Sequence, residues 1–302
     1  MLDKAFGKNW YEEKPFEFEK LIKHLQVWPK YTKDKTVWVF RGQLDTYELQ
    51  TSLERECGKS GLRLTSADHI EEMIVREFRR LYDGEDRLEV LKDSLYCLSL
   101  LQHHGAPTRL LDFSYSKYVA MYFGLKAAYN SIESDKEKVR FALWCIDTTD
   151  MNDRAKKLFP KGSPLRQAFE DRVDININKR NEDSFISLYM GKNDLVMSEN
   201  PARIHKRLHL QQGVLLCPGN VTKPFIENLK SLYGSKATTR VKKLVCTLDI
   251  KDVQRAFEYL MRMNITEESL FPGLDGHVRS INYNMWLYER LCQVYATSKE
   301  QK

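Results

Sequence analysis

The chain has 302 residues, of which 42% are hydrophobic and 11% aromatic, a composition that suits a soluble globular protein of one large domain or two small ones. No stretch approaches the roughly 20 apolar residues of a membrane-spanning helix. The first residues also lack the apolar core of a secretion signal, so we expect a cytoplasmic protein that does not bind membranes. The net charge of +6 suits a nucleotide or another polyanionic ligand, but falls short of the clustered Lys and Arg of a nucleic-acid-binding surface.

Common metal and cofactor motifs are missing from the sequence. None of the six cysteines forms a CxxC pair, so we expect neither a zinc site nor another metal centre. Cys145, Cys217 and Cys246 lie in apolar, strand-like runs and are predicted to be small buried hydrophobic residues. GxGxxG, GxxxxGK[ST], GxSxG and HExxH are all absent, which argues against Rossmann and P-loop nucleotide sites, a hydrolase nucleophile elbow and a zinc protease.

The first 42 residues predict a helix and then a strand. Residues 1–30 read as an amphipathic helical lead-in, and residues 36–42 alternate as a β-strand. Gly42 lets the backbone approach another group closely. Arg41 projects from the end of the strand, where anionic ligands are commonly held; the alternative is a side chain whose charged head simply reaches water.

Residues 65–82 predict a second helix that begins with a capping box formed by Thr65 and Asp68. Its glutamates and arginines are predicted to form a solvated face. The predicted buried stripe consists of Ile70, Ile74, Phe78 and Leu81.

The stretch 100–128 combines many polar side chains with core-forming residues. A helix runs into Gln102 and is broken by a loop that contains Gly105 and Pro107. A short apolar run over residues 109–113 follows, and either Ser114 or Ser116 caps the next helix. The charged residues of this run, Arg109 and Asp112, either pair with each other across the turn or face a pocket.

The second half predicts strands at residues 139–147, 214–217 and 241–250, and a helix over 252–263 that buries Val253, Phe257 and Leu260. Residues 148–200 are polar and weakly periodic, and we interpret them as an insertion or lid over the core. Residues 266–277 open with capping chemistry and end in a Pro/Gly turn, and residues 282–295 predict a further helix.

Several segments closely resemble the signatures of the FRG domain family. They are residues 40–43 (FRGQ), 101–113 (LQHHGAPTRLLDF), 119–123 (VAMYF), 200–204 (NPARI), 211–214 (QQGV) and 270–276 (LFPGLDG). The resemblance implies a single FRG-type domain over residues 1–302. We assign it a helical lead-in at 1–30, a variable insertion at 148–200 and a C-terminal helix at 282–298.

A weaker resemblance connects the chain with ADP-ribosyltransferases. In the arginine-type members a strand that ends in Tyr/Phe-Arg-Gly opens the NAD site, and residues 40–42 are similar to it. A glutamate that precedes a later strand stabilises the oxocarbenium-like transition state, whereas this sequence has Gln211 and Gln212 at the similar position. An amide keeps the hydrogen bond and loses the charge, which costs on the order of 3 kcal/mol or a hundredfold in rate.

The fold expected from these resemblances is of the α+β class and ADP-ribosyltransferase-like, with a bent mixed or antiparallel sheet that is split into two halves and surrounded by helices. The expected pocket lies between the halves and is lined by Arg41, the 102–114 loop and Gln211.

The first functional hypothesis is an enzyme, an ADP-ribosyltransferase or NAD glycohydrolase that acts as a bacterial toxin or phage-defence effector, with a protein or nucleic acid as acceptor. Arg41 would bind a phosphate, Gln211 the ribose, and Asp112 would stabilise the cationic transition state. His103 or His104 would position a phosphate or assist proton transfer. The other predicted ligand-binding residues are Gln43, Thr108, Arg109, Ser114 and Gln212.

The second hypothesis is a non-catalytic module that binds a nucleotide or a nucleic acid in the same pocket. The glutamine in place of the glutamate and the basic segment 203–207 favour it. Under this hypothesis Arg41 is essential for binding, whereas the charge of Asp112 hardly matters.

Overall fold

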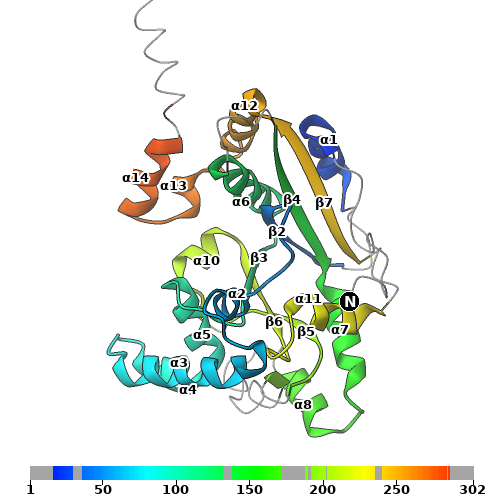
Figure 1. Ribbon diagram of the computed structural model, residues 1–302, viewed down its shortest axis with the longest axis vertical. Coiled ribbons are helices and arrows are strands. Elements are labelled where there is room, and N and C mark those ends of the chain that lie inside the picture. The colour runs from blue at the N-terminus through cyan, green and yellow to red at the C-terminus, as the bar shows by residue number, and fades with distance from the viewer. Residues whose placement is uncertain are drawn as a thin grey trace, which may run out of the picture.

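A single mixed sheet organises the molecule (Figure 1). The computed structural model describes residues 16–29, 36–131, 138–171, 188–189, 192–201, 203–234, 240–283 and 285. These residues form a seven-stranded sheet in the order β1-β7-β4-β2-β3-β6-β5. The strands are β1 (Phe16–Glu17), β2 (Trp38–Leu44), β3 (Leu111–Ser114), β4 (Lys138–Asp147), β5 (Val196–Glu199), β6 (Gly213–Pro218) and β7 (Val241–Asp249). The short β1 runs parallel to β7, and the other neighbouring strands are antiparallel.

The sheet has a seam between β2 and β3. Along its other edge β2 pairs with β4 over its whole length, from Trp38 to Leu44. Towards β3, in contrast, the described residues form a single register pair, Phe40 with Ser114. The seam divides the sheet into a half with β1, β7, β4 and β2 and a half with β3, β6 and β5. The expected mixed sheet with surrounding helices is thereby confirmed.

One face of the sheet is covered by α1 (Phe18–Val27), α6 (Lys117–Asn130) and α12 (Ile250–Met261). Strand positions that alternate towards this face, such as Phe40, Phe141 and Leu244, pack with the helices into one core cluster. Two short helices, α13 (Glu267–Leu270) and α14 (Leu274–Tyr283), follow α12 and lie beside α6 (Figure 1).

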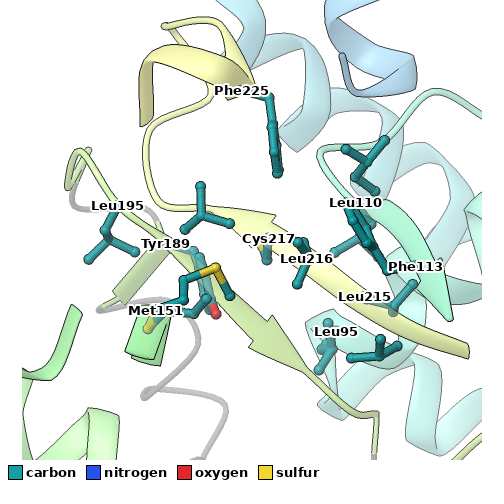
Figure 2. Packing of buried hydrophobic residues seen from close by; sticks show 14 of the residues in the cluster. Leu95, Leu110, Phe113, Met151, Tyr189, Leu195, Leu215, Leu216, Cys217 and Phe225 are labelled. Carbon is teal, nitrogen blue, oxygen red and sulfur yellow. The ribbon is translucent and has the colours of Figure 1, made fainter. Parts of the chain in front are cut away.

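The opposite face carries the larger core cluster (Figure 2). Phe113 from β3 and Leu216 from β6 meet Leu95, Met151 and Phe225 from three surrounding helices. The helices on this side and at its rim are α2 (Ser52–Lys59), α3 (Ala67–Leu81), α4 (Arg87–Lys92), α5 (Ser94–His103), α7 (Thr148–Leu158), α8 (Pro164–Asp171), α10 (Lys206–Leu210) and α11 (Phe225–Tyr233), with a 3₁₀ turn at Leu64–Ser66.

Most of the predicted elements are present. The strands at residues 36–42, 139–147, 214–217 and 241–250 correspond to β2, β4, β6 and β7, and the helix over 252–263 corresponds to α12. Of the two candidate caps for α6, Ser116 is the N-cap and accepts a hydrogen bond from the Val119 amide. The five cysteines that the structure describes are free and buried, as expected for the three in strands.

Three expectations fail or are only partly testable. The capping box of Thr65 and Asp68 is wrong, because the 3₁₀ turn occupies residues 64–66 and Ser66 caps α3 without a side-chain bond. Leu81 is 81% exposed rather than buried. Residues beyond 283, apart from 285, lie outside the described chain, so the helix over 282–295 remains a prediction.

The described part of residues 148–200 belongs to the core. Met151 and Ala155 on α7 and Phe169 on α8 are buried in the larger cluster. Asn152 also covers the outer edge of β5, where its side chain exchanges hydrogen bonds with the amide and the hydroxyl of Ser198. These contacts correct the interpretation as a lid, because the segment completes one side of the sheet. In the described residues no helix combines the length and apolarity required to cross a membrane.

Gly42 is required by close packing between β2 and α6. A Cβ atom at this position would lie 1.8 Å from the carbonyl oxygen of Ala120 and 2.5 Å from the amide nitrogen of Gly124. Both contacts are backbone atoms of α6, which cannot move aside as a side chain can. The close approach that the sequence predicted at Gly42 is therefore an approach to a helix.

We predict that Gly42→Ala lowers the free energy of unfolding by about 1–3 kcal/mol or more, since the new methyl group must displace α6. Urea denaturation measures the change. The control is Gly58→Ala in α2, where an added Cβ meets no atom within 4 Å; this helical alanine should stabilise by about 0.5–1 kcal/mol. Equal effects of the two substitutions would contradict the packing argument.

Candidate functional site

A pocket of about 240 Å³ lies at the seam of the sheet. Strands β2 and β3 form one side of it, and the start of α2 and the loop after α5 form the other. The lining residues are Arg41, Ser52, Arg55, Gln102, Gly105, Ala106, Leu110, Leu111 and Asp112. We refer to this hollow as the seam pocket.

Arg41 spans the seam. Its Nη1 donates a hydrogen bond to the backbone carbonyl of Asp112 at 2.8 Å, and its Nε donates to Oε1 of Gln43 at 3.1 Å. The guanidinium thus provides a hydrogen bond between β2 and β3 at the point where backbone pairing of the two strands ends. Burial and the nearby Arg55 charge lower the pKa of Arg41, and the Asp112 charge offsets part of this effect. A guanidinium nevertheless stays protonated in a protein.

Gln43 holds the arginine in place. Its Nε2 donates to the carbonyls of Tyr47 and Glu48, at 2.8 and 3.2 Å. These two acceptors fix the orientation of the amide, so that its oxygen faces Arg41. The predicted ligand-binding residue Gln43 therefore has a positioning role, and the structure does not place it in the pocket lining.

Arg55 is a lining residue that the sequence analysis missed. Its Nη1 donates to the carbonyl of Gln50 at 2.6 Å. The described acceptors of Arg55 and of Nη1 of Arg41 are backbone carbonyls, and no carboxylate in the described part of the chain forms an ion pair with either guanidinium, although the Asp112 charge acts on Arg41. Two guanidinium groups thus share one small pocket, which favours an anionic ligand.

Asp112 reaches Arg41 through its backbone. Leu111 and Phe113 on either side are buried in the larger core cluster, whereas Asp112 is exposed. Alternation along a strand directs the Asp112 side chain to the face opposite these two neighbours. The predicted proximity of Arg41 and Asp112 is present in the structure, but the bond joins the guanidinium to a carbonyl.

Thr108 fixes the loop that closes the pocket. Its backbone amide bonds to Oγ of Ser52 at 2.9 Å, and its carbonyl accepts the Leu53 amide at 3.1 Å. Its hydroxyl bonds to Oε1 of Gln102. Thr108 is fully buried and does not line the pocket, so its contacts dock α2 against the loop.

Arg109 lies in the core, away from the pocket lining. Its guanidinium forms an ion pair with Glu71 of α3 and donates to the Tyr189 carbonyl at 2.8 Å, and its amide bonds to the same carboxylate at 2.9 Å. Both side chains are 1% exposed. Burial opposes the charge on Arg109, but the Glu71 carboxylate raises its pKa overall. The pairing of Arg109 with Asp112 and the solvated position of Glu71 are both wrong, because α3 supplies the partner.

The histidines of the loop form a cluster beside the pocket. The ring of His103 lies 4.3 Å from that of His205 and 5.0 Å from that of His104. His205 caps α10, since its Nδ1 accepts the Leu208 amide at 3.1 Å. Burial, His103 and Arg207 lower the pKa of His205 to about 4, and burial lowers the pKa of His103. His103 and His104 do not line the seam pocket.

Gln211, Gln212 and Ser114 lie at a second junction. Nε2 of Gln211 donates to the Leu270 carbonyl at 3.2 Å. The guanidinium of Arg207 lies over the ring of the next residue, Phe271. Oγ of Ser114 donates to the Gln211 carbonyl at 2.7 Å. Gln212 is exposed in a left-handed conformation with φ of 48°. The structure thus brings Arg41 and Asp112 together, and it places Gln211 outside the seam pocket lining.

A larger hollow of about 640 Å³ lies between α1 and α12. It contains none of the predicted site residues. Its charged groups pair largely with each other, as Arg255 does with Asp252 at 3.1 Å. The described residues contain no group of side chains suited to a metal ion. The seam pocket is therefore the better candidate.

The family model of the FRG domain matches residues 36–133. Residues 36–133 are thus similar to the FRG domain. The match begins just before β2 and ends just after α6, and every residue that lines the seam pocket lies within it. No curated protein and no solved structure matches the chain, so the resemblance to ADP-ribosyltransferases stays an expectation.

We predict that Glu71→Ala lowers the free energy of unfolding by about 3 kcal/mol or more, because it leaves the buried Arg109 charge without its partner. Urea denaturation tests this prediction. Glu72→Ala is the matched control, since the neighbouring side chain is 57% exposed, and it should change stability by no more than about 0.5 kcal/mol. Similar losses in both variants would show that the ion pair is not important.

We predict that acidification from pH 7 to pH 5 destabilises the protein in part through His205. The unfolded chain binds a proton at this residue near its ordinary pKa of 6.5, whereas the folded chain does so only near 4. The unfolded state therefore takes up more protons over this range, and the free energy of unfolding decreases as the pH is lowered. His205→Asn keeps a capping side chain and should lose less stability between pH 7 and pH 5 in urea denaturation. A loss as large as in the wild type would contradict this assignment.

Proposed function

We propose that this FRG-domain protein binds a phosphorylated small molecule of the nucleotide type in the seam pocket. The observation that carries the proposal is the presence of two guanidinium groups, Arg41 and Arg55, in a pocket where no described carboxylate pairs with them. Guanidinium groups bind phosphate oxygens through paired, charge-assisted hydrogen bonds.

The size of the pocket supports binding of one end of a ligand. Sites that enclose a whole drug-sized molecule measure roughly 300–1,000 Å³, whereas the seam pocket measures about 240 Å³. The phosphate and the group next to it would lie inside, and the rest of a nucleotide would lie outside. Leu110 and Ala106 provide apolar contact for the carbon atoms next to the phosphate.

The second candidate is an enzyme that cleaves NAD, either as an ADP-ribosyltransferase or as an NAD glycohydrolase. The charge of Asp112 close to Arg41 supports it, because a carboxylate is needed to stabilise a cationic transition state. The position of Gln211 at the other junction weighs against it. A role as a toxin or in phage defence is a hypothesis that belongs to this second candidate.

We predict that Arg41→Ala and Arg55→Ala each weaken the binding of AMP at least tenfold, since a hydrogen bond to a charged group contributes about 1.5–3 kcal/mol. Isothermal titration calorimetry at low salt measures the affinity. The control is Arg76→Ala on the exposed surface of α3, which should leave the affinity unchanged. If neither pocket variant binds AMP more weakly than the control does, the proposal is wrong.

The same proteins incubated with NAD distinguish the two candidates. Release of nicotinamide that Asp112→Asn abolishes would support the enzyme. Binding of AMP without nicotinamide release, in the presence or absence of a cell lysate as a source of acceptors, would support the binding module.

A further inference from the structure

The seam pocket offers its ligand many hydrogen-bond donors. Arg41 uses Nε and one N–H of Nη1 within the protein, which leaves three of its five donors without an acceptor among the described residues. Arg55 uses one and retains four. A ligand that presents only acceptors would satisfy these groups best.

Gln102 adds a third donor group, because its orientation is fixed. The Thr108 hydroxyl is buried and accepts the Leu110 amide at 3.3 Å, so its own proton needs another acceptor. Oε1 of Gln102 is that acceptor. The Nε2 of Gln102 is then left for the pocket, which Gln102 lines, and no described residue accepts from it.

The remaining polar side chains change this balance little. The Ser52 hydroxyl is engaged with Thr108, donating to its carbonyl at 3.2 Å and accepting from its amide at 2.9 Å. The carbonyl of Asp112 already accepts from Arg41. Its carboxylate follows the face of β3 opposite to Leu111 and Phe113, but its charge still offsets part of the fall in the Arg41 pKa. The free hydrogen-bonding capacity of the pocket is therefore mainly that of N–H donors on three residues.

We propose that the seam pocket selects a phosphomonoester in its dianionic form, such as the terminal phosphate of a nucleoside monophosphate, with Gln102 as the third binding residue. This inference rests on the proposed function and specifies its ligand. A phosphomonoester dianion presents three terminal oxygens that only accept. The monoanion carries an O–H that finds few acceptors here, and each phosphate within a dinucleotide such as NAD has only two terminal oxygens and one charge.

Because the pocket prefers the dianion to the monoanion, the ligand affinity should rise with pH as the phosphate loses its second proton. The second pKa of a phosphomonoester is about 6, so the dianion fraction rises about tenfold between pH 5 and pH 7. Sulfate is a dianion over the whole range and controls for titration of the protein. The charged or titratable groups near the pocket are Arg41, Arg55, Asp112, His103 and His104.

The experiment is calorimetry with AMP, NAD and sulfate at pH 5, 6, 7 and 8 and constant ionic strength. We expect the AMP affinity to rise several-fold, up to about tenfold, from pH 5 to pH 7. The sulfate affinity should stay constant, and NAD should bind at least tenfold more weakly than AMP at pH 8. An AMP affinity that follows the pH dependence of sulfate, or equal binding of NAD and AMP, would overturn the inference.

Gln102→Glu tests the third donor. The glutamate keeps an oxygen for the Thr108 hydroxyl and replaces the donor with a negative charge, so we expect at least a tenfold loss of AMP affinity. The control is Gln26→Glu on the exposed face of α1, which adds the same charge elsewhere, and urea denaturation checks that both variants fold. Equal affinities of the two variants would overturn the role of Gln102. If neither AMP nor sulfate binds the wild type, the proposed function itself is wrong.

Discussion

The bond between the Arg41 guanidinium and the Asp112 carbonyl joins the two halves of the sheet where backbone pairing ends. A strand that leaves its neighbour after one register pair exposes backbone groups, and each of them needs a partner. The Arg41 side chain supplies one such donor, because it is long enough to reach a carbonyl that lies too far from any backbone amide of β2. The space between the separated strands is the seam pocket. The early end of backbone pairing between β2 and β3 therefore accounts both for the bond from Arg41 to Asp112 and for the candidate site.

The surroundings of the pocket are rigid because each side of it is bonded independently. Gln43 orients Arg41 from the strand side, and Thr108 joins the loop to the start of α2. Arg109 anchors the same loop in the core through Glu71 of α3. Preorganised donors lose little conformational freedom when a ligand binds, which favours recognition of a small, highly charged group.

The segments that resemble the FRG family meet at two places. Residues 40–43 and 101–113 surround the seam pocket, whereas Gln211 contacts residue Leu270 of the later segment at the junction of α10 and α13. Phe123 of α6 packs on Phe271 at that second junction. Segments with a common family signature therefore support different parts of the structure, and the contact of Gln211 with Leu270 holds α13 against the body of the domain.

The sequence by itself determined strands β2, β4, β6 and β7, helices α3, α5, α6 and α12, and the importance of residues 40–43 and 101–113. Local alternation, helical periodicity and turn residues act over short distances, which is why these elements were predictable. Glu71 and Arg55 could not be predicted, since their positions depend on how α3 and α2 dock on the loop. The hydrophobic pattern of α3 alone predicts that Glu71 lies on a solvated face. Its burial is favourable only because Arg109, 38 residues further along the chain, pairs with it. Which predicted residues share a pocket was likewise decided by the tertiary structure, because the seam sets Arg41 beside Asp112 and turns Gln211 towards α13.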